Sequence, residues 1–172
     1  MESKNKKIKD ADIKKLVGKL GSSNGLDRQK ARKEMVKQGK KVVDYLEELL
    51  SHPKHVYRWE AVKTLEEIED PAAIPLLILA LEDDKSDVRW IAAKGLIKLG
   101  KQSIVPVLEA LEKKSDSVFV LEGAHHVFFD LKENNELPKG FPAKKLLSVL
   151  KNPEWAESVK PYVYELLNKP KD

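Results

Sequence analysis

Two adjacent stretches of the sequence are copies of one pattern: VYRWEAVKTLEEIEDPAAIPLLILAL at residues 56–81 and DVRWIAAKGLIKLGKQSIVPVLEAL at residues 87–111. A shift of 31 positions lays Tyr57-Arg58-Trp59-Glu60-Ala61 on Val88-Arg89-Trp90-Ile91-Ala92, and the same shift lays Pro75 on Pro106. Repeats with a period of roughly 20 to 50 residues are typical of solenoids, in which each unit buries its apolar face only by stacking on the next. The pattern therefore predicts a stack of similar units.

Each unit is predicted to contain two antiparallel helices. Apolar residues of the first helix recur at helical spacing, as in Val88, Ile91, Ala92, Leu96 and Leu99. A short break follows at 69–71 in one unit and at 100–102 in the next. Pro75 and Pro106 are then expected in the first turn of the second helix, where a missing N–H costs no helical hydrogen bond.

Looser copies flank this pair. Upstream, residues 28–35 match 58–65 at a shift of 30, and residues 42–50 supply a second helix. Downstream, the positions that match at a shift of 31 are Phe119, Gly123, Ala124 and Val127. The connection inside this last copy lengthens to residues 132–142, and its second helix is expected at 143–150.

These units together predict an all-α protein, a right-handed α-α superhelix of about four helix pairs with capping helices. We expect one domain over residues 1–172. Its parts are a basic N-terminal capping helix within 1–25, repeats over 26–151 and a C-terminal capping helix within 152–172.

The two ends carry helix-end signals. Asp10 or Asp12 is expected to cap the first helix, and Asn152 followed by Pro153 is expected to begin the last. Pro161 is expected to kink or split that last helix, because proline removes an internal hydrogen bond.

The quoted stretches resemble the short HEAT-like repeats of bacterial and archaeal proteins, the type found in phycobilin lyase subunits. The resemblance extends over roughly residues 26–150 and is closest from 55 to 112. It implies the solenoid fold. The resemblance does not identify a function, because HEAT-like proteins include scaffolds, lyase subunits, an iron hydroxylase and DNA glycosylases.

Enzymatic activity is not expected. The deoxyhypusine hydroxylases of this fold carry His-Glu pairs that hold iron, whereas this chain has Trp59-Glu60 and Trp90-Ile91 at those places. Arg-Trp pairs at 58–59 and 89–90 are similar to those of HEAT-like DNA glycosylases, but no catalytic carboxylate can be transferred. We predict no cofactor, and a metal-dependent or lyase-subunit role is only the third hypothesis.

One segment, LEGAHHVFFD, carries metal-ligand types at helical spacing. Glu122, His126 and Asp130 recur every four residues, and imidazole with carboxylate suits zinc, iron or manganese. His52 and His55 lie far away in the sequence. We therefore favour a surface cluster with ordinary contacts between residues four apart, and predict no metal site.

Composition bears on the location of the protein. Cysteine is absent, which excludes disulfides and thiolate chemistry. The opening MESKNKKIKD lacks the apolar core of a signal peptide, and the longest apolar run, 74–81, is far below the roughly 20 residues that span a bilayer. We expect a soluble, cytoplasmic protein without a membrane span.

Charge is unevenly distributed along the chain. Residues 1–41 carry 14 Lys/Arg against 5 Asp/Glu, and the remaining residues carry 18 against 23. A basic end attracts nucleic acid, anionic membranes or acidic partners. The alternative hypothesis is therefore a nucleic-acid-binding protein that uses Lys6, Lys7, Lys14, Lys15, Arg28 and Arg32. A solvated lysine-rich terminus explains the same composition.

The second helix of the first copy, AAIPLLILALED, is apolar nearly all round. The residues expected to face the core are Ile74, Leu77, Ile78 and Leu81, so Leu76 and Leu79 are not needed for the core. The repeat equivalents of these two leucines are Val107 and Ala110. Such a helix is either buried or exposes a patch that a partner covers. In HEAT solenoids the second helices line the concave side, which makes this surface the expected docking face.

The leading hypothesis is a non-catalytic interaction or scaffold module that binds a protein partner, for example an amphipathic helix. The candidate residues are Leu76, Leu79, Val107, Trp59 and Trp90. Two other interpretations stay open: neighbouring helices cover the apolar positions, and each Trp packs between repeats. A second copy of the chain would serve as partner equally well.

Overall fold

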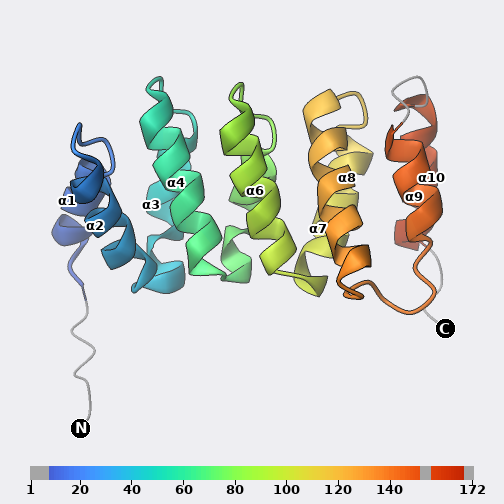
Figure 1. The fold of residues 1–172 in the computed structure, drawn as a ribbon, viewed down its shortest axis with the longest axis horizontal. Helices are drawn as coiled ribbons and strands as arrows, with labels where there is room; N and C mark the ends of the chain where they lie inside the picture. Colours follow the sequence, from blue (N-terminus) through green and yellow to red (C-terminus); the bar gives the residue numbers. More distant parts are fainter. Residues whose placement is uncertain (1–7, 152–155, 169–172) are drawn as a thin grey trace, which may run out of the picture.

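Ten α-helices make up the described part of the chain in the computed structural model, residues 8–151 and 156–168, where no strand occurs (Figure 1). The helices are α1 (Asp10–Lys19), α2 (Gly25–Val36), α3 (Val43–Leu50), α4 (His55–Ile68), α5 (Ile74–Ala80), α6 (Ser86–Lys98), α7 (Lys101–Lys113), α8 (Val118–Glu133), α9 (Ala143–Lys151) and α10 (Ala156–Asn168). Short 3₁₀ helices at Gly39–Val42 and Pro71–Ala73 lead into α3 and α5. None of the described helices is long and apolar enough to cross a membrane.

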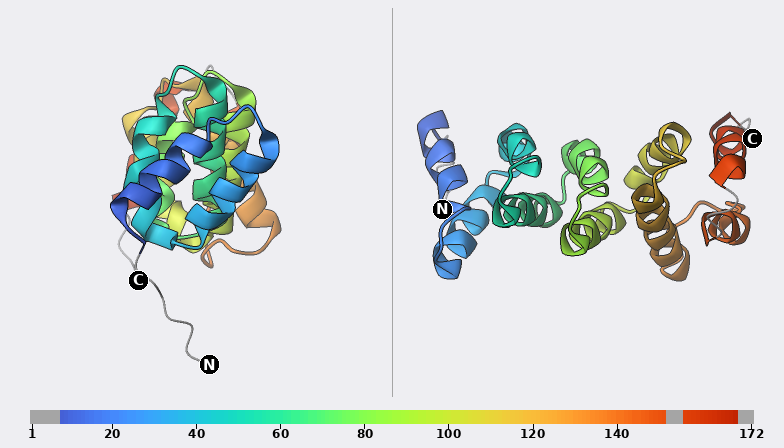
Figure 2. Two further views of the ribbon diagram at one scale, coloured as in Figure 1. Left: turned by 90° about the vertical axis from the view of Figure 1, so that its left-hand side faces the viewer. Right: turned by 90° about the horizontal axis from the view of Figure 1, so that it is seen from above.

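The helices form two layers (Figures 1 and 2). The A layer consists of α2, α4, α6, α8 and α9, and the B layer behind it consists of α1, α3, α5, α7 and α10. Seen from above, the helix pairs follow one another in a nearly straight row. The predicted all-α solenoid is confirmed.

The core lies between the two layers. Its completely buried leucines include Leu65 and Leu96 from the A layer and Leu77, Leu81 and Leu111 from the B layer. Burying one such side chain stabilises the fold by roughly 1.5–3 kcal/mol. Because each unit is covered by its neighbours, this stabilisation arises from stacking and not from any unit alone.

The two repeat prolines differ in position. Pro75 lies in the first turn of α5, as predicted, whereas α7 begins at Lys101 and encloses Pro106, so that prediction is wrong. Gly100 allows the early start, because its φ of 56° is accessible to glycine without strain. Pro106 leaves the carbonyl of Gln102 without its helical partner, and Gln102 is exposed to water.

The helix α8 is shifted by one residue from the predicted register. Val88 and Val120 are both completely buried, which makes the shift between these units 32 positions. Phe119, the predicted match of Val88, is 40% exposed. The chain from α6 to α8, which contains the longer helix α7, has one more residue than the chain from α4 to α6, since α8 begins 32 positions after α6 and α6 begins 31 positions after α4.

The connection after α8 changes the architecture at the C-terminal end. The helix predicted at 143–150 forms as α9, but it lies beside α8 in the A layer (Figure 1). The place beside α7 in the B layer is taken by α10 (Figure 2). Asn135 and Gly140 adopt φ angles of 59° and 79° within this connection, which runs along the lower edge of the molecule from α8 to α9 in Figure 1.

The helix ends also differ from the predicted ones. Lys9 is the residue before α1, and Asp10 and Asp12 lie in the first turn of the helix. Their negative charges interact favourably with the positive end of the helix dipole. The predicted split at Pro161 does not occur, because α10 stays helical from 156 to 168. The predicted start of the last helix at residues 152–153 lies outside the described residues.

Candidate functional site

A recurring arginine joins each loop to the unit that follows. Arg28, Arg58 and Arg89 are the fourth residues of α2, α4 and α6, and each donates to the carbonyl six residues earlier, at 2.8, 3.0 and 2.8 Å. Arg28 and Arg58 also pair with carboxylates farther along the chain, and the guanidinium of Arg89 lies 4.0 Å from the ring centre of Phe119. These arginines therefore have a structural role.

Glu60 on α4 pairs with two of the arginines that the nucleic-acid hypothesis requires. Its carboxylate, 4% exposed, accepts hydrogen bonds from Nε of Arg28 at 3.1 Å and from Nη1 of Arg32 at 2.5 Å. Arg32 also pairs with Glu67 at 3.2 Å. Both positive charges are compensated inside the protein, which weakens their attraction for a phosphate.

The other residues of that hypothesis lie in or before α1. Lys14 pairs with Asp10 at 3.0 Å, and Lys15 is exposed on the same helix. Lys6 and Lys7 lie outside the described residues. The structure thus brings none of these lysines together with Arg28 or Arg32 in the part of the chain it describes.

Glu66, also on α4, is buried between two lysines. Nζ of Lys63 lies 2.6 Å away and Nζ of Lys98, on α6, lies 2.9 Å away. Burial alone raises the pKa of the Glu66 carboxyl, but the hydrogen bonds and charges of both ammonium groups outweigh it and hold the pKa below its usual value. Nζ of Lys98 also lies 2.9 Å from the carboxylate of Glu69. These ion pairs join α4 to α6.

The two candidate tryptophans have different surroundings. Trp59 is half-buried, with the guanidinium of Arg32 5.7 Å from its ring centre. Trp90 is 55% exposed and stacks on His126 of α8, with ring centres 4.3 Å apart and an angle of 27° between the planes. A cleft of about 270 Å³ opens here between α6 and α8, and Phe119 is part of its lining. Trp90 therefore bridges two units while one face stays accessible.

The predicted metal-ligand spacing produces an ordinary contact. Nε2 of His126 lies 3.5 Å from the carboxylate of Asp130, and Glu122 lines the cleft beside Trp90. Within residues 8–151 and 156–168, no group of three or more His, Asp or Glu side chains is arranged to hold a metal ion.

The apolar residues that are buried in the B layer differ from those predicted to face the core. Leu76 is 9% exposed and Val107 is completely buried, so both belong to the core and their prediction as binding residues is wrong. Leu79 is 47% exposed, and Val105, which the sequence pattern did not single out, is 50% exposed. Ile78, predicted in the core, is only half-buried. Because α5 is apolar on every side, its sequence contains no signal for the direction in which it is turned.

The five candidate binding residues therefore do not share one surface. Trp59 and Trp90 stand on the A layer, whereas Leu79 stands on the B layer. Two grooves lie on the B layer, one on each side of α5, and Leu79 lines one of them.

The apolar groove lies between α5 and α7 and has a volume of about 440 Å³. Its lining consists of Pro71, Ile74, Pro75, Ile78, Pro106 and Ala110, together with Glu109, Lys113 and Lys114. Its apolar walls are formed by residues three or four positions apart on each helix, which places one apolar contact at each turn.

The acidic groove lies between α3 and α5 and has a volume of about 480 Å³. Its lining consists of Glu47, Glu48, Leu50, Ser51, Leu79, Ala80, Glu82 and Asp83. The ridge of α5 separates the two grooves, because Ile78 lines the apolar groove and Leu79 lines the acidic groove.

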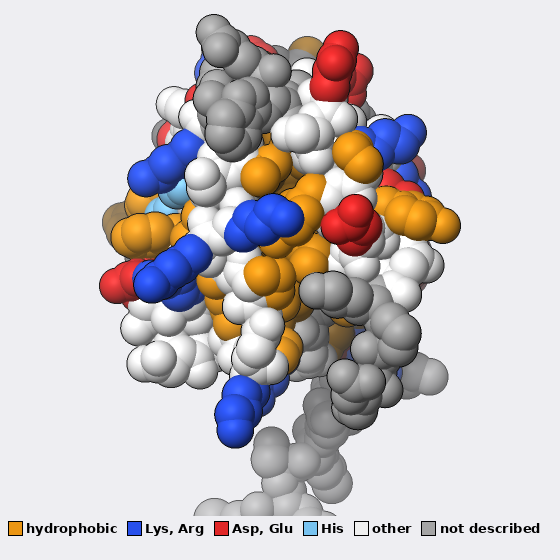
Figure 3. Space-filling model, turned by 90° about the vertical axis from the view of Figure 1, so that its right-hand side faces the viewer, with side chains coloured by type: hydrophobic (Ala, Val, Ile, Leu, Met, Phe, Trp, Pro, Cys, Tyr) orange, Lys and Arg blue, Asp and Glu red, His pale blue; other side chains and the backbone are white. Residues whose placement is uncertain are grey.

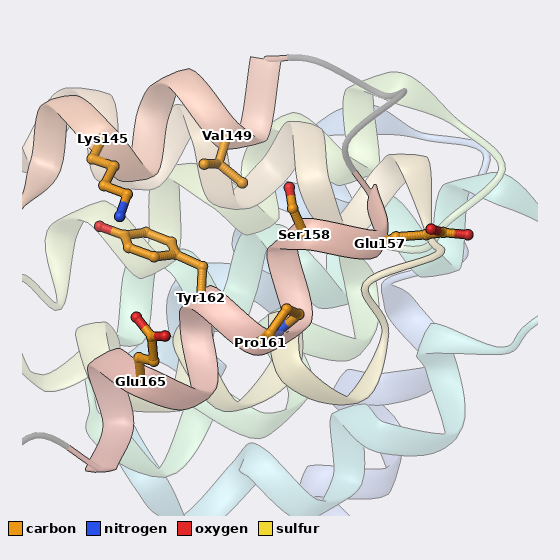
Figure 4. A pocket seen from close by; sticks show the side chains of 7 residues that line it. All are labelled: Lys145, Val149, Glu157, Ser158, Pro161, Tyr162 and Glu165. Atoms are coloured by element: carbon orange, nitrogen blue, oxygen red, sulfur yellow. The ribbon is translucent and has the colours of Figure 1, made fainter.

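Another hollow lies between α9 and α10, at the C-terminal end of the solenoid. Apolar side chains gather at the centre of this end, with charged side chains around them (Figure 3). In the close-up, Lys145 of α9 points toward Tyr162 of α10, and its Nζ lies 4.5 Å from the ring centre (Figure 4). Burial, and to a smaller extent the charge of Glu165, raises the pKa of Tyr162. The cation–π contact explains this arrangement as packing between the last two helices.

The fold and its grooves define a class of protein: a repeat solenoid that presents grooves between successive helices. A family model of HEAT repeats matches residues 13–96 and, overlapping with them, residues 43–124. These matches cover more than half of the chain, and the protein belongs to the HEAT repeat family. HEAT repeats generally act as protein-interaction scaffolds and are typically not enzymes. The comparison with curated proteins gives no match.

Proposed function

We propose that this protein is a non-catalytic interaction module that binds a protein partner through the solvent side of its B layer. The observation that carries the proposal is the exposed apolar surface of α5 and α7. Leu79 on α5 and Val105 on α7 are 47% and 50% exposed, and a groove of about 440 Å³ with mostly apolar walls lies between these two helices. A partner that covers such surface gains roughly 25 cal/mol for each Å² of apolar area removed from water.

The form of the apolar groove favours a helical peptide element as its occupant. Pro75 and Ile78 stand three positions apart on α5, and Pro106 and Ala110 stand four positions apart on α7. The apolar face of an amphipathic helix has the same spacing, so its side chains can enter the groove once per turn. This arrangement supports recognition of a protein segment.

Nucleic-acid binding is the less favoured alternative. Arg28 and Arg32 would have to leave Glu60 before they could contact phosphates, and the cost of leaving that carboxylate unpaired opposes the exchange. Binding by the exposed lysines alone would be steeply sensitive to salt.

Affinity capture from a lysate of the source organism tests the proposal, with nuclease present throughout. The wild-type chain is compared with a Leu79→Gln/Val105→Gln variant, which removes apolar surface without adding charge. We expect a specific protein to be retained by the wild type and lost by the variant, while circular dichroism shows an unchanged helical spectrum. The matched control is Leu26→Gln, because Leu26 is 65% exposed at the start of α2 in the opposite layer.

Retention of the same protein by the double variant would place its docking surface elsewhere and overturn the proposal. Material that is retained only when nuclease is omitted would support the nucleic-acid alternative.

A further inference from the structure

Two of the four carboxylates that line the acidic groove already have cationic partners. Asp83 pairs with Arg58 at 2.7 Å, and Glu82 pairs with Lys114. These pairs hold the loop after α5 and the end of α7 in place, so they belong to the fold.

The other two carboxylates form no ion pair in the described part of the chain, although the charge of Glu48 adds to the larger effect of Asp10 in raising the pKa of Lys14. Glu47 and Glu48 are exposed on α3, and no ion pair involves them within the described residues. Asp44, one turn earlier on α3, is exposed in the same way. Lys14 of α1 lines a hollow with Asp44 and Glu48, but its ammonium bonds to Asp10 at 3.0 Å. A negative patch therefore borders the apolar surface of a chain whose net charge is +4.

We infer that the partner of the B layer is an amphipathic helix that carries lysine or arginine along one edge. Its apolar face occupies the apolar groove, and its basic edge crosses α5 at Leu79 and meets Glu47 and Glu48. This inference rests on the proposed function and names the chemistry of the partner. Charge complementarity selects the basic edge, because an acidic edge would meet charge of its own sign.

The side chains of the acidic groove suit lysine and arginine in a second respect. Leu79 and Leu50 line the groove together with the carboxylates, so an aliphatic stem can lie on the leucines while its charged end reaches Glu47 or Glu48. Exposed ion pairs contribute little affinity each. The apolar groove therefore supplies most of the affinity, and the acidic groove determines the orientation of the bound helix.

A displayed library of amphipathic helices tests this inference on the full chain. Each library member has about 20 residues, a fixed apolar face and flanking positions that are randomised among Lys, Arg, Glu, Gln and Ser. We expect selection to enrich helices with Lys or Arg along one edge only. The dissociation constant of an enriched peptide is then measured with the purified variants.

Glu47→Gln/Glu48→Gln is expected to weaken binding of that peptide by roughly three- to ten-fold. Raising the salt from about 0.1 to 1 M shortens the screening length from roughly 10 to 3 Å and should reduce this difference. The matched control is Asp27→Asn/Glu122→Gln, which removes two exposed carboxylates from the A layer and should leave binding unchanged.

The outcomes separate this inference from the proposed function. Enriched helices that lose affinity with Leu79→Gln but have no basic edge overturn the inference and leave the proposed function standing. Helices that bind equally well to Leu79→Gln/Val105→Gln remove the support for both.

Two further results would identify a different occupant. A gain in peptide affinity after Lys4, Lys6 and Lys7 are changed to Gln would identify the chain's own basic N-terminal segment as the occupant. A dimer that dissociates with Leu79→Gln would identify a second copy. Either result overturns the assignment to a partner helix.

Discussion

Substitution of Glu60 tests the structural account of the A layer most directly. The carboxylate is 4% exposed and lies between Arg28 and Arg32, at 3.1 and 2.5 Å. Glu60→Gln keeps the shape of the side chain and removes its charge. Two guanidinium groups are then left with a single amide oxygen between them, and their mutual repulsion is no longer compensated.

The expected loss follows from the number of charge-assisted hydrogen bonds and from their exposure. Each such bond contributes about 1.5–3 kcal/mol. Arg28 is 26% exposed and Arg32 keeps its pair with Glu67, so water and the remaining partner recover part of the loss. We expect the free energy of unfolding to fall by about 2–4 kcal/mol. For a chain of this size, this change lowers Tm by roughly 6–12 °C.

Differential scanning calorimetry of the wild type and the variant measures the shift. Glu34→Gln is the matched control, because the Glu34–Lys37 pair, at 2.6 Å, has side chains that are 53% and 65% exposed. Its removal should change Tm by less than about 2 °C. A shift for Glu60→Gln no larger than that of the control would refute the reasoning, because it would show that water replaces the carboxylate at no cost.

Further predictions concern packing and pH. Gly123→Ala should destabilise the protein by roughly 1–3 kcal/mol, because the new Cβ would lie 2.7 Å from Cδ2 of Leu81. Gly18→Ala, with nothing within 4 Å of the new Cβ, should instead stabilise it by about 0.5–1 kcal/mol, and urea unfolding curves check the two opposite signs. Burial, the charge of Lys151 and the adjacent histidine lower the pKa of His125, whose buried Nε2 has no hydrogen-bond partner in the described structure. His125 therefore binds a proton more tightly in the unfolded chain than in the folded one. The free energy of unfolding should then fall as the pH drops below about 6.5. His125→Gln should reduce this slope in urea titrations between about pH 5 and 7.5, and equal slopes in both proteins would contradict the assignment.

The sequence predicts those features that depend on neighbouring turns of one helix. The match of residues 57–61 to 88–92, with apolar spacing after each, predicts α4 and α6, because a buried stripe is a local pattern. Family membership and the helical class follow from the same residues. Local signals were insufficient at Pro106, where the positive φ of Gly100 lets α7 begin five residues before the proline.

The candidate site depends on contacts between helices, which no single helix specifies. Arg28 and Arg32 meet Glu60, 32 and 28 residues away, because α2 packs on α4. The position of α9 beside α8, with α10 against α7, likewise depends on where the connection after α8 leads.

By itself, the sequence of this protein determined the repeat, the helices and the apolar character of α5. Only the tertiary structure decided that Leu76 faces the core while Leu79 meets water. A helix that is apolar on every side has no preferred direction of its own. Its exposed face is the one that the neighbouring helices leave uncovered.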